Sequence, residues 1–249
     1  MKKRIYLMAL LIIVSIYILY SVVPVSAKSY QIPETIRVGL FYQDSSVNTA
    51  LSIFDITSGK GLIFGFSEGN TFTEILSENF KRSGNSTIYV RKDTFYYDDG
   101  GALKEYSPGA SSAKMAESKN KYGPFHIQIG SNLPDAQSAK ELVNSYRKLG
   151  IQAFIAYNDA WQIWAGMYES EKEAMKDMEN IKGKQENIDL CIVSPNATGV
   201  MVVDSKFQPL CAFSSNKSYL LIKPAPESDP PVINIKGKPY RGSLEVRRP

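Results

Sequence analysis

The chain has 249 residues, of which 43% are hydrophobic, and its formal net charge is +4. Lys2, Lys3 and Arg4 supply three of these charges, so the rest of the chain carries only about +1. This near-neutral body excludes the basic footprint of a nucleic-acid-binding protein, and the length is enough for one large or two small domains.

Residues 1–27 are predicted to direct export. No charged residue occurs from 5 to 27, and a run of about 20 apolar residues can cross a bilayer as a helix. The preceding cations stay on the cytoplasmic side, which places the rest of the chain outside. Val25-Ser26-Ala27 is typical of a signal-peptidase site. Both a cleaved signal peptide and an uncleaved membrane anchor fit this pattern. The protein is therefore expected to be extracytoplasmic and to face the cell wall, either secreted or anchored to the membrane.

Residues 34–106 are predicted to be β-rich. The expected strands occupy residues 36–42, 50–56, 62–66, 87–91 and 93–97. Residues 107–121 are rich in Ser, Ala, Gly and Lys and show no amphipathic face, which favours a linker.

Ser67 lies in a G-x-S-x-G sequence, the pattern of the serine-hydrolase nucleophile elbow. A strand precedes it, and residues 71–80 could form the helix that the elbow requires. However, the chain has one histidine, His126, which lies in a different predicted unit. The pattern therefore favours a glycine-rich hairpin end. No H-E-x-x-H or C-x-x-C motif occurs, so neither a metal nor another cofactor is predicted.

Residues 122–195 show the clearest organisation, with the order β-α-β-β-α-β. The predicted strands are 125–130, 151–157, 161–168 and 188–194, and the predicted helices are 134–149 and 171–183. Ser170 and Glu173 form a capping box at the start of the second helix. The sequence thus predicts an α+β fold, in which two helices cover one face of a four-stranded antiparallel sheet.

The other face of this sheet is the predicted binding site. Alternation along the strands turns Ile127, Ile129, Ile163 and Ala165 toward the helices. The residues then expected on the open face are Gln128 and Trp164 first, followed by His126 and Gln162. An exposed indole beside amides suits a sugar polymer, although another domain or a partner could cover this face instead. RNA-recognition domains share the element order, but their aromatic motif is missing.

Residues 199–249 are again predicted to be β-rich. Strands are expected at 199–204, 209–213 and 219–223, and at 232–235 and 240–246 around Lys236-Gly237-Lys238. The two cysteines, Cys191 and Cys211, can be either a disulfide or two buried thiols.

Two segments of the 122–195 unit resemble the SPOR domain: Phe125-His126-Ile127-Gln128-Ile129-Gly130-Ser131 and Trp161-Gln162-Ile163-Trp164-Ala165-Gly166. SPOR domains bind peptidoglycan, notably glycan strands stripped of their stem peptides. The resemblance implies the same ligand here. Gln162 stands where SPOR domains often carry arginine.

The flanks are similar to SpoIID/LytB-type sporulation proteins, which are lytic transglycosylases. The similarity rests on residues 35–40 and on residues 235–246, which resemble the opening of the catalytic domain. It implies that 199–249 is an incomplete SpoIID/LytB-like domain, whose catalytic glutamate would lie further downstream. The chain is therefore expected to bind glycan without cleaving it; the alternative is a cell-wall lytic transglycosylase.

Overall fold

The computed structural model describes residues 38–41, 46, 50–59, 61–68, 71–76, 87–110, 112–214, 218–226 and 230–248. The predicted export segment 1–27 lies outside these residues. None of the helices in the described ranges is both long and apolar enough to span a bilayer. The chain divides into a unit 1–40 and a unit 41–249, and all of the described helices and strands lie in the second unit.

The mixture of strands and helices confirms the predicted α+β class. In chain order the described elements are β1 (Ile53–Thr57), β2 (Leu62–Glu68), β3 (Thr71–Leu76), β4 (Ile88–Lys92), β5 (Tyr96–Asp98), β6 (Leu103–Glu105), α2 (Ala113–Glu117), β7 (Lys121–Tyr122), β8 (Phe125–Ile129), α3 (Ala136–Lys148), β9 (Ala153–Tyr157), β10 (Trp161–Tyr168), α4 (Glu171–Lys184), β11 (Leu190–Val193), β12 (Val200–Val203), β13 (Pro209–Phe213), β14 (Tyr219–Pro224), β15 (Val232–Ile235), β16 (Lys238–Arg241) and β17 (Leu244–Val246).

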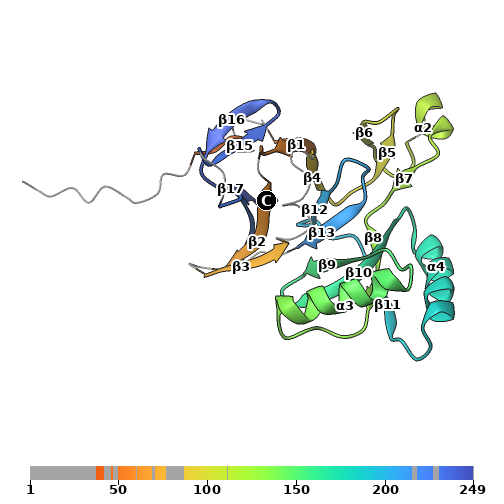
Figure 1. Cartoon of the computed structure of the whole chain (residues 1–249). Helices are drawn as coiled ribbons and strands as arrows, with labels where there is room; N and C mark the ends of the chain where they lie inside the picture. Colours follow the sequence, from red (N-terminus) through yellow and green to blue (C-terminus); the bar gives the residue numbers. More distant parts are fainter. Residues whose placement is uncertain are drawn as a thin grey trace, which may run out of the picture. The chain divides into compact units, whose positions relative to one another are not determined.

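The strands form three sheets (Figure 1). The largest has the order β11-β8-β10-β9-β13-β12-β4-β1-β15-β16, and the smaller ones have the orders β17-β14-β2-β3 and β6-β5-β7. The four strands expected to stand alone, β8 to β11, are thus one end of a ten-stranded sheet. The sheet continues because β13 pairs with β9 in parallel, with Cys211 opposite Ile155.

The segments on either side of the β8–β11 region pair with each other. β1 lies between β4 and β15, β4 also pairs with β12, and β2 pairs with β14. The structure therefore joins the regions 34–106 and 199–249, which the sequence analysis treated separately. The segment 107–121, predicted as a linker, contains the short helix α2, and residues 71–76 form a strand and not the helix that a nucleophile elbow would require.

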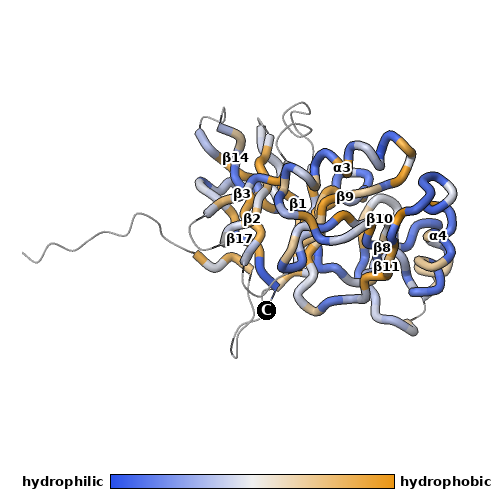
Figure 2. The backbone as a smooth tube through the Cα atoms, turned by 90° about the horizontal axis from the view of Figure 1, so that it is seen from below, coloured by the Kyte–Doolittle hydropathy of each residue, from blue (hydrophilic) through white to orange (hydrophobic). Residues whose placement is uncertain are grey.

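The two longer helices begin and end where their capping residues indicate. The Asp135 carboxylate accepts a hydrogen bond from Ser138 N at 2.7 Å, and Gly150, at a φ of +73°, follows the end of α3. Ser170 caps α4 in the same way. α3 packs on β9 and β10, and α4 packs on β8, β10 and β11. In Figure 2 hydrophilic and hydrophobic residues mix along α4, as expected for a helix that buries one side.

Gly123, just before β8, allows its backbone to lie close to the backbone at the end of β10. Its N–H donates to Met167 O at 3.2 Å, and a Cβ at this position would lie 1.9 Å from Tyr168 O and 2.6 Å from Glu169 Cα. We expect Gly123→Ala to lower the free energy of unfolding by about 1–3 kcal/mol, because backbone must shift to admit the methyl group. Urea denaturation measures this change.

Gly183→Ala is the matched control, because no atom lies within 4 Å of its added Cβ in α4. Alanine in a helix is favoured by about 1 kcal/mol over glycine, so this variant should be as stable as the parent or more stable. Equal urea midpoints for the two variants would contradict the close approach at Gly123.

Candidate functional site

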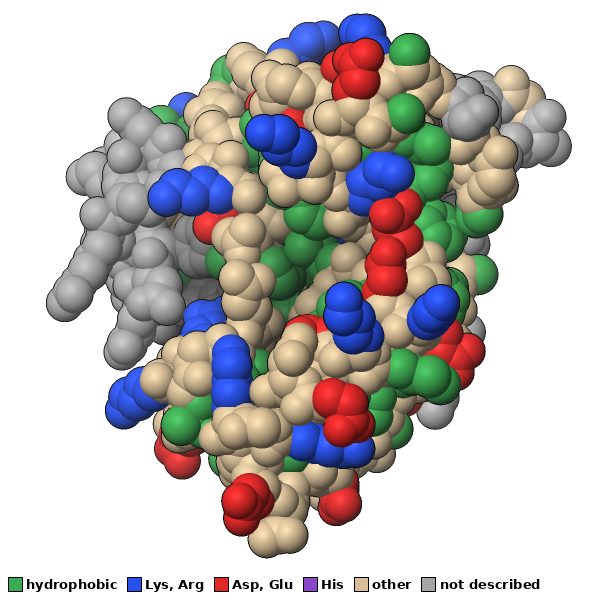
Figure 3. Space-filling view, turned by 90° about the vertical axis from the view of Figure 1, so that its right-hand side faces the viewer, with side chains coloured by type: hydrophobic (Ala, Val, Ile, Leu, Met, Phe, Trp, Pro, Cys, Tyr) green, Lys and Arg blue, Asp and Glu red, His purple; other side chains and the backbone are tan. Residues whose placement is uncertain are grey.

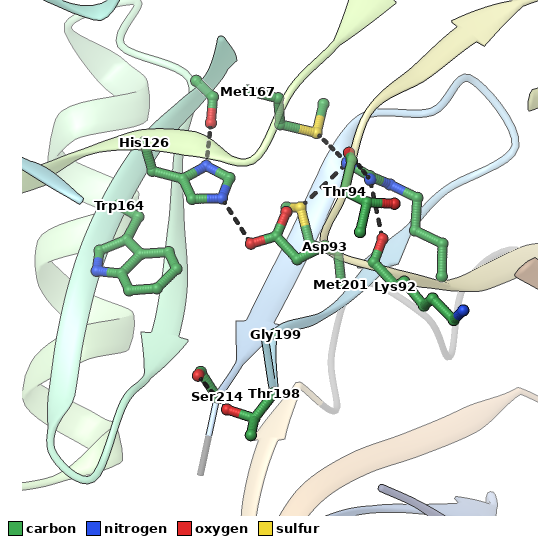
Figure 4. Close-up of polar contacts among 12 residues, drawn as sticks. Lys92, Asp93, Thr94, His126, Trp164, Met167, Thr198, Gly199, Met201 and Ser214 are labelled. Atoms are coloured by element: carbon green, nitrogen blue, oxygen red, sulfur yellow. Dashed lines mark hydrogen bonds and ion pairs between the residues drawn. The ribbon is translucent and has the colours of Figure 1, made fainter. Parts of the chain in front are cut away.

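His126 on β8 is the centre of a buried polar cluster. Its Nε2 lies 3.0 Å from Asp93 Oδ2, and its Nδ1 lies 2.6 Å from Gly166 O. A carbonyl oxygen only accepts, so Nδ1 donates to Gly166 O, and Nε2 forms the hydrogen bond with the Asp93 carboxylate. Both ring nitrogens are therefore engaged, and the imidazole has one fixed orientation (Figure 4).

Aromatic rings enclose the same imidazole. Trp164 stacks on it with ring centroids 5.0 Å apart and planes 19° apart, and Phe154 meets it edge-on at 5.7 Å. Trp164 and Phe154 belong to an apolar cluster that also contains Met201 of β12 and Ala212 of β13. Residues from the strands that follow the β8–β11 region thus pack on the face of the sheet that was expected to be open.

The expectation that this face is exposed is wrong for three of its four predicted residues. His126, Trp164 and Gln162 are 0%, 2% and 7% exposed. The physical reason is the continuation of the sheet through β13, β12 and β4, which brings apolar side chains over the indole. Of the two alternatives, the structure has the covered face, and the cover comes from the chain itself. A role of these residues in ligand binding stays a prediction.

Gln128 is the predicted residue that remains half-exposed. It lies opposite Trp164 on β10 and opposite Cys191 on β11, and its Nε2 donates to Gly130 O at 3.0 Å. The four predicted residues therefore share one face, as the alternation indicated. They differ in exposure: Gln128 is half-exposed, and the other three are buried beneath the cover.

A chain of hydrogen bonds leads from the buried indole to the surface. Trp164 Nε1 donates to Gln162 Oε1 at 2.8 Å, and Gln162 Nε2 donates to Asn132 Oδ1 at 2.8 Å. Asn132 is exposed and lies in the turn after β8, a position that sequence reasoning missed. Gln128 and Cys191 are accessible on this face, and Ser131 and Asn132 are exposed in the turn after β8; these four residues are called here the β8–β11 patch.

A buried arginine lies beside the cluster. Arg91 is 2% exposed; its guanidinium donates to the sulfur atoms of Met167 and Met201 at 3.1 and 3.2 Å and lies 4.8 Å from the centre of the Tyr96 ring. Burial lowers the pKa of Arg91, and the nearby carboxylate of Asp93 opposes that shift. Burial also raises the pKa of Tyr96 to about 12. Asp93 thus contacts His126 on one side and lies near the Arg91 guanidinium on the other.

The other motif residues have different surroundings. Ser67 is buried within β2, opposite Phe72 and Tyr219, and not at a strand-to-helix turn as a nucleophile elbow requires. Cys191 is exposed and Cys211 is buried, both as free thiols, and burial raises the pKa of Cys211 to about 12. Within the described ranges, no three His, Cys, Asp or Glu side chains gather as metal ligands would.

We expect Asp93→Ala to destabilise the fold strongly, because it leaves His126 and Arg91 buried without their carboxylate. Removing one partner of a buried pair costs about 3–5 kcal/mol. Asp99→Ala is the matched control: it removes only an exposed ion pair with Lys114, for about 1 kcal/mol or less. Urea denaturation followed by tryptophan fluorescence measures the free energy of unfolding of both variants. An equal decrease in the two variants would show that the buried pair contributes no more than the exposed one.

Comparison with known proteins identifies the part of the chain that holds this cluster. The family model of the SPOR domain matches residues 121–194, which confirms the resemblance seen in the sequence. No curated protein and no solved structure matches the chain. Asp93, Met201 and Ala212 lie outside the matched residues, so the cover over the sheet face comes from the flanking strands. Residues 121–194 are a SPOR domain, and SPOR domains bind peptidoglycan.

Proposed function

We propose that this protein is exported and holds peptidoglycan glycan strands through the SPOR domain at residues 121–194. The observation that carries the proposal is the SPOR match itself, because peptidoglycan is the ligand of such domains. The charge-free, apolar run at residues 5–27, with cations before it, supports delivery of the domain to the side of the membrane where this ligand occurs.

We further propose the β8–β11 patch as the place where glycan binds. Gln128 is half-exposed, and Ser131 and Asn132 are exposed, so their amides and hydroxyl can donate to and accept from sugar hydroxyls. Trp164, His126 and Gln162 then act from beneath as positioning residues. Gln162 fixes Asn132 through its hydrogen bond, and Trp164 fixes Gln162.

Co-sedimentation of the full chain with purified peptidoglycan sacculi tests this site. Gln128→Ala removes one hydrogen-bonding amide from the patch and is expected to weaken retention about fivefold, which corresponds to about 1 kcal/mol. Gln137→Ala is the matched control, because Gln137 is exposed on α3 and bonds Glu141. Retention that is equal for both variants would exclude the patch, and a parent chain that stays in the supernatant would overturn the proposed function.

The relationship to SpoIID/LytB-type sporulation proteins is also a proposal. It is supported by the likeness of residues 35–40 and 235–246 to those proteins. Within the second segment Gly237 and Gly242 have φ angles of +74° and +100°, so the backbone needs glycine at both places. Zymography on glycan-rich sacculi separates binding from the lytic transglycosylase alternative: a binding module leaves the gel turbid, whereas cleared bands would establish cleavage.

A further inference from the structure

A cavity of about 470 Å³ lies on the side of the molecule that carries β5, β6 and α4. Its lining comes from Phe95, from the segment after β6, from the start of β8, and from the junction of β10 with α4. Its volume falls within the range of about 300–1,000 Å³ that is common for small-molecule sites. Figure 3 faces this side and shows a hollow with hydrophobic side chains inside and charged side chains around it.

One wall of the cavity is aromatic. Phe95, Tyr106 and Phe125 line it, and the rings of Phe95 and Tyr106 lie 5.7 Å apart at an angle of 56°. Tyr106 N donates to Phe95 O at 3.0 Å, which holds these two rings on neighbouring backbone. All three rings are only half-buried, so aromatic surface is available to a ligand.

The part of the lining beside Tyr106 is acidic. Glu169 and Glu171 line it, and no lysine or arginine is among the lining residues. Tyr106 donates its phenolic hydrogen to Glu169 Oε1. Burial raises the pKa of Tyr106, and Glu169 raises it further, so the phenol keeps the proton that it donates. In the described part of the chain, neither Glu169 nor Glu171 forms an ion pair.

This combination selects a cation. Aromatic faces attract an ammonium group and pack against its methylene stem, and carboxylates accept charge-assisted hydrogen bonds from it. A cation would form an ion pair with the two carboxylates, whereas a neutral sugar could only form hydrogen bonds with them. Charge complementarity thus points to a primary ammonium on a short aliphatic chain.

We infer that this cavity binds the side-chain ammonium of a diamino acid in a cell-wall peptide. The identification of the peptide's source rests on the proposed function, because a protein held on stripped glycan strands meets this amine on uncrosslinked stem peptides of neighbouring strands. Cross-linking acylates the amine and removes its charge. The cavity would therefore separate uncrosslinked from cross-linked wall, a distinction that a glycan-binding face alone does not make.

Calorimetric titration of the full chain with a soluble tripeptide ending in lysine tests the inference. The same peptide acetylated on the lysine side chain is the ligand control. We expect saturable binding of the free amine and at least tenfold weaker binding of the acetylated peptide. No binding, equal binding of both peptides, or preferential binding of an uncharged disaccharide would overturn the inference.

Glu171→Gln tests the acidic part of the lining and is expected to weaken peptide binding about tenfold. Glu179→Gln makes the same change of charge on an exposed turn of the same helix, outside the cavity, and should leave affinity unchanged. Equal affinities for the two variants would overturn the assignment. Sedimentation with peptide-free glycan is run in parallel. A chain that binds the peptide but not the glycan would refute the proposed function alone. A chain that binds the glycan but not the peptide would refute only the inference about the cavity.

Discussion

The hydrogen bonds of His126 join three separate parts of the chain at one buried ring. In the order of the large sheet, β8 and β4 are separated by β10, β9, β13 and β12. Five strand spacings of about 4.8 Å would hold them about 24 Å apart in a flat sheet. Yet Asp93, directly after β4, lies 3.0 Å from His126 on β8. The sheet must therefore curve strongly, as twisted sheets of many strands do, and the pair fixes that curvature.

Charge in the interior depends on the same contact. Arg91 and His126 are both buried, and Asp93 is the carboxylate close to both. No group in the described ranges donates to Asp93 Oδ1, and none accepts from Arg91 Nε. Such under-satisfied groups are costly away from water, and here they lie close to each other, the carboxylate opposing the effect of burial on Arg91. The end of β4 is thus tied to the SPOR domain by the contact of Asp93 with His126, and β13 is tied to it by strand pairing with β9.

Local features of the sequence predicted local structure well. The capping residues Asp135 and Ser170 mark the starts of α3 and α4, and alternation put Gln128 and Trp164 on one face, as their register shows. Alternation cannot say what covers a face. That depends on the parallel pairing of β13 with β9, a contact between distant segments. β12 is buried at every residue, so its apolar run gives no sign of which neighbours it takes.

The burial of Trp164 also explains the residue at position 162. A buried indole N–H needs an acceptor, and Gln162 Oε1 supplies it while the Gln162 amide nitrogen donates to Asn132. An amide can do both, whereas arginine, which SPOR domains often carry at this position, has donors only. Arginine here would leave the indole N–H without its acceptor. Glutamine at this position is therefore suited to a covered sheet face, and under the proposed function glycan meets the accessible Gln128 and Asn132.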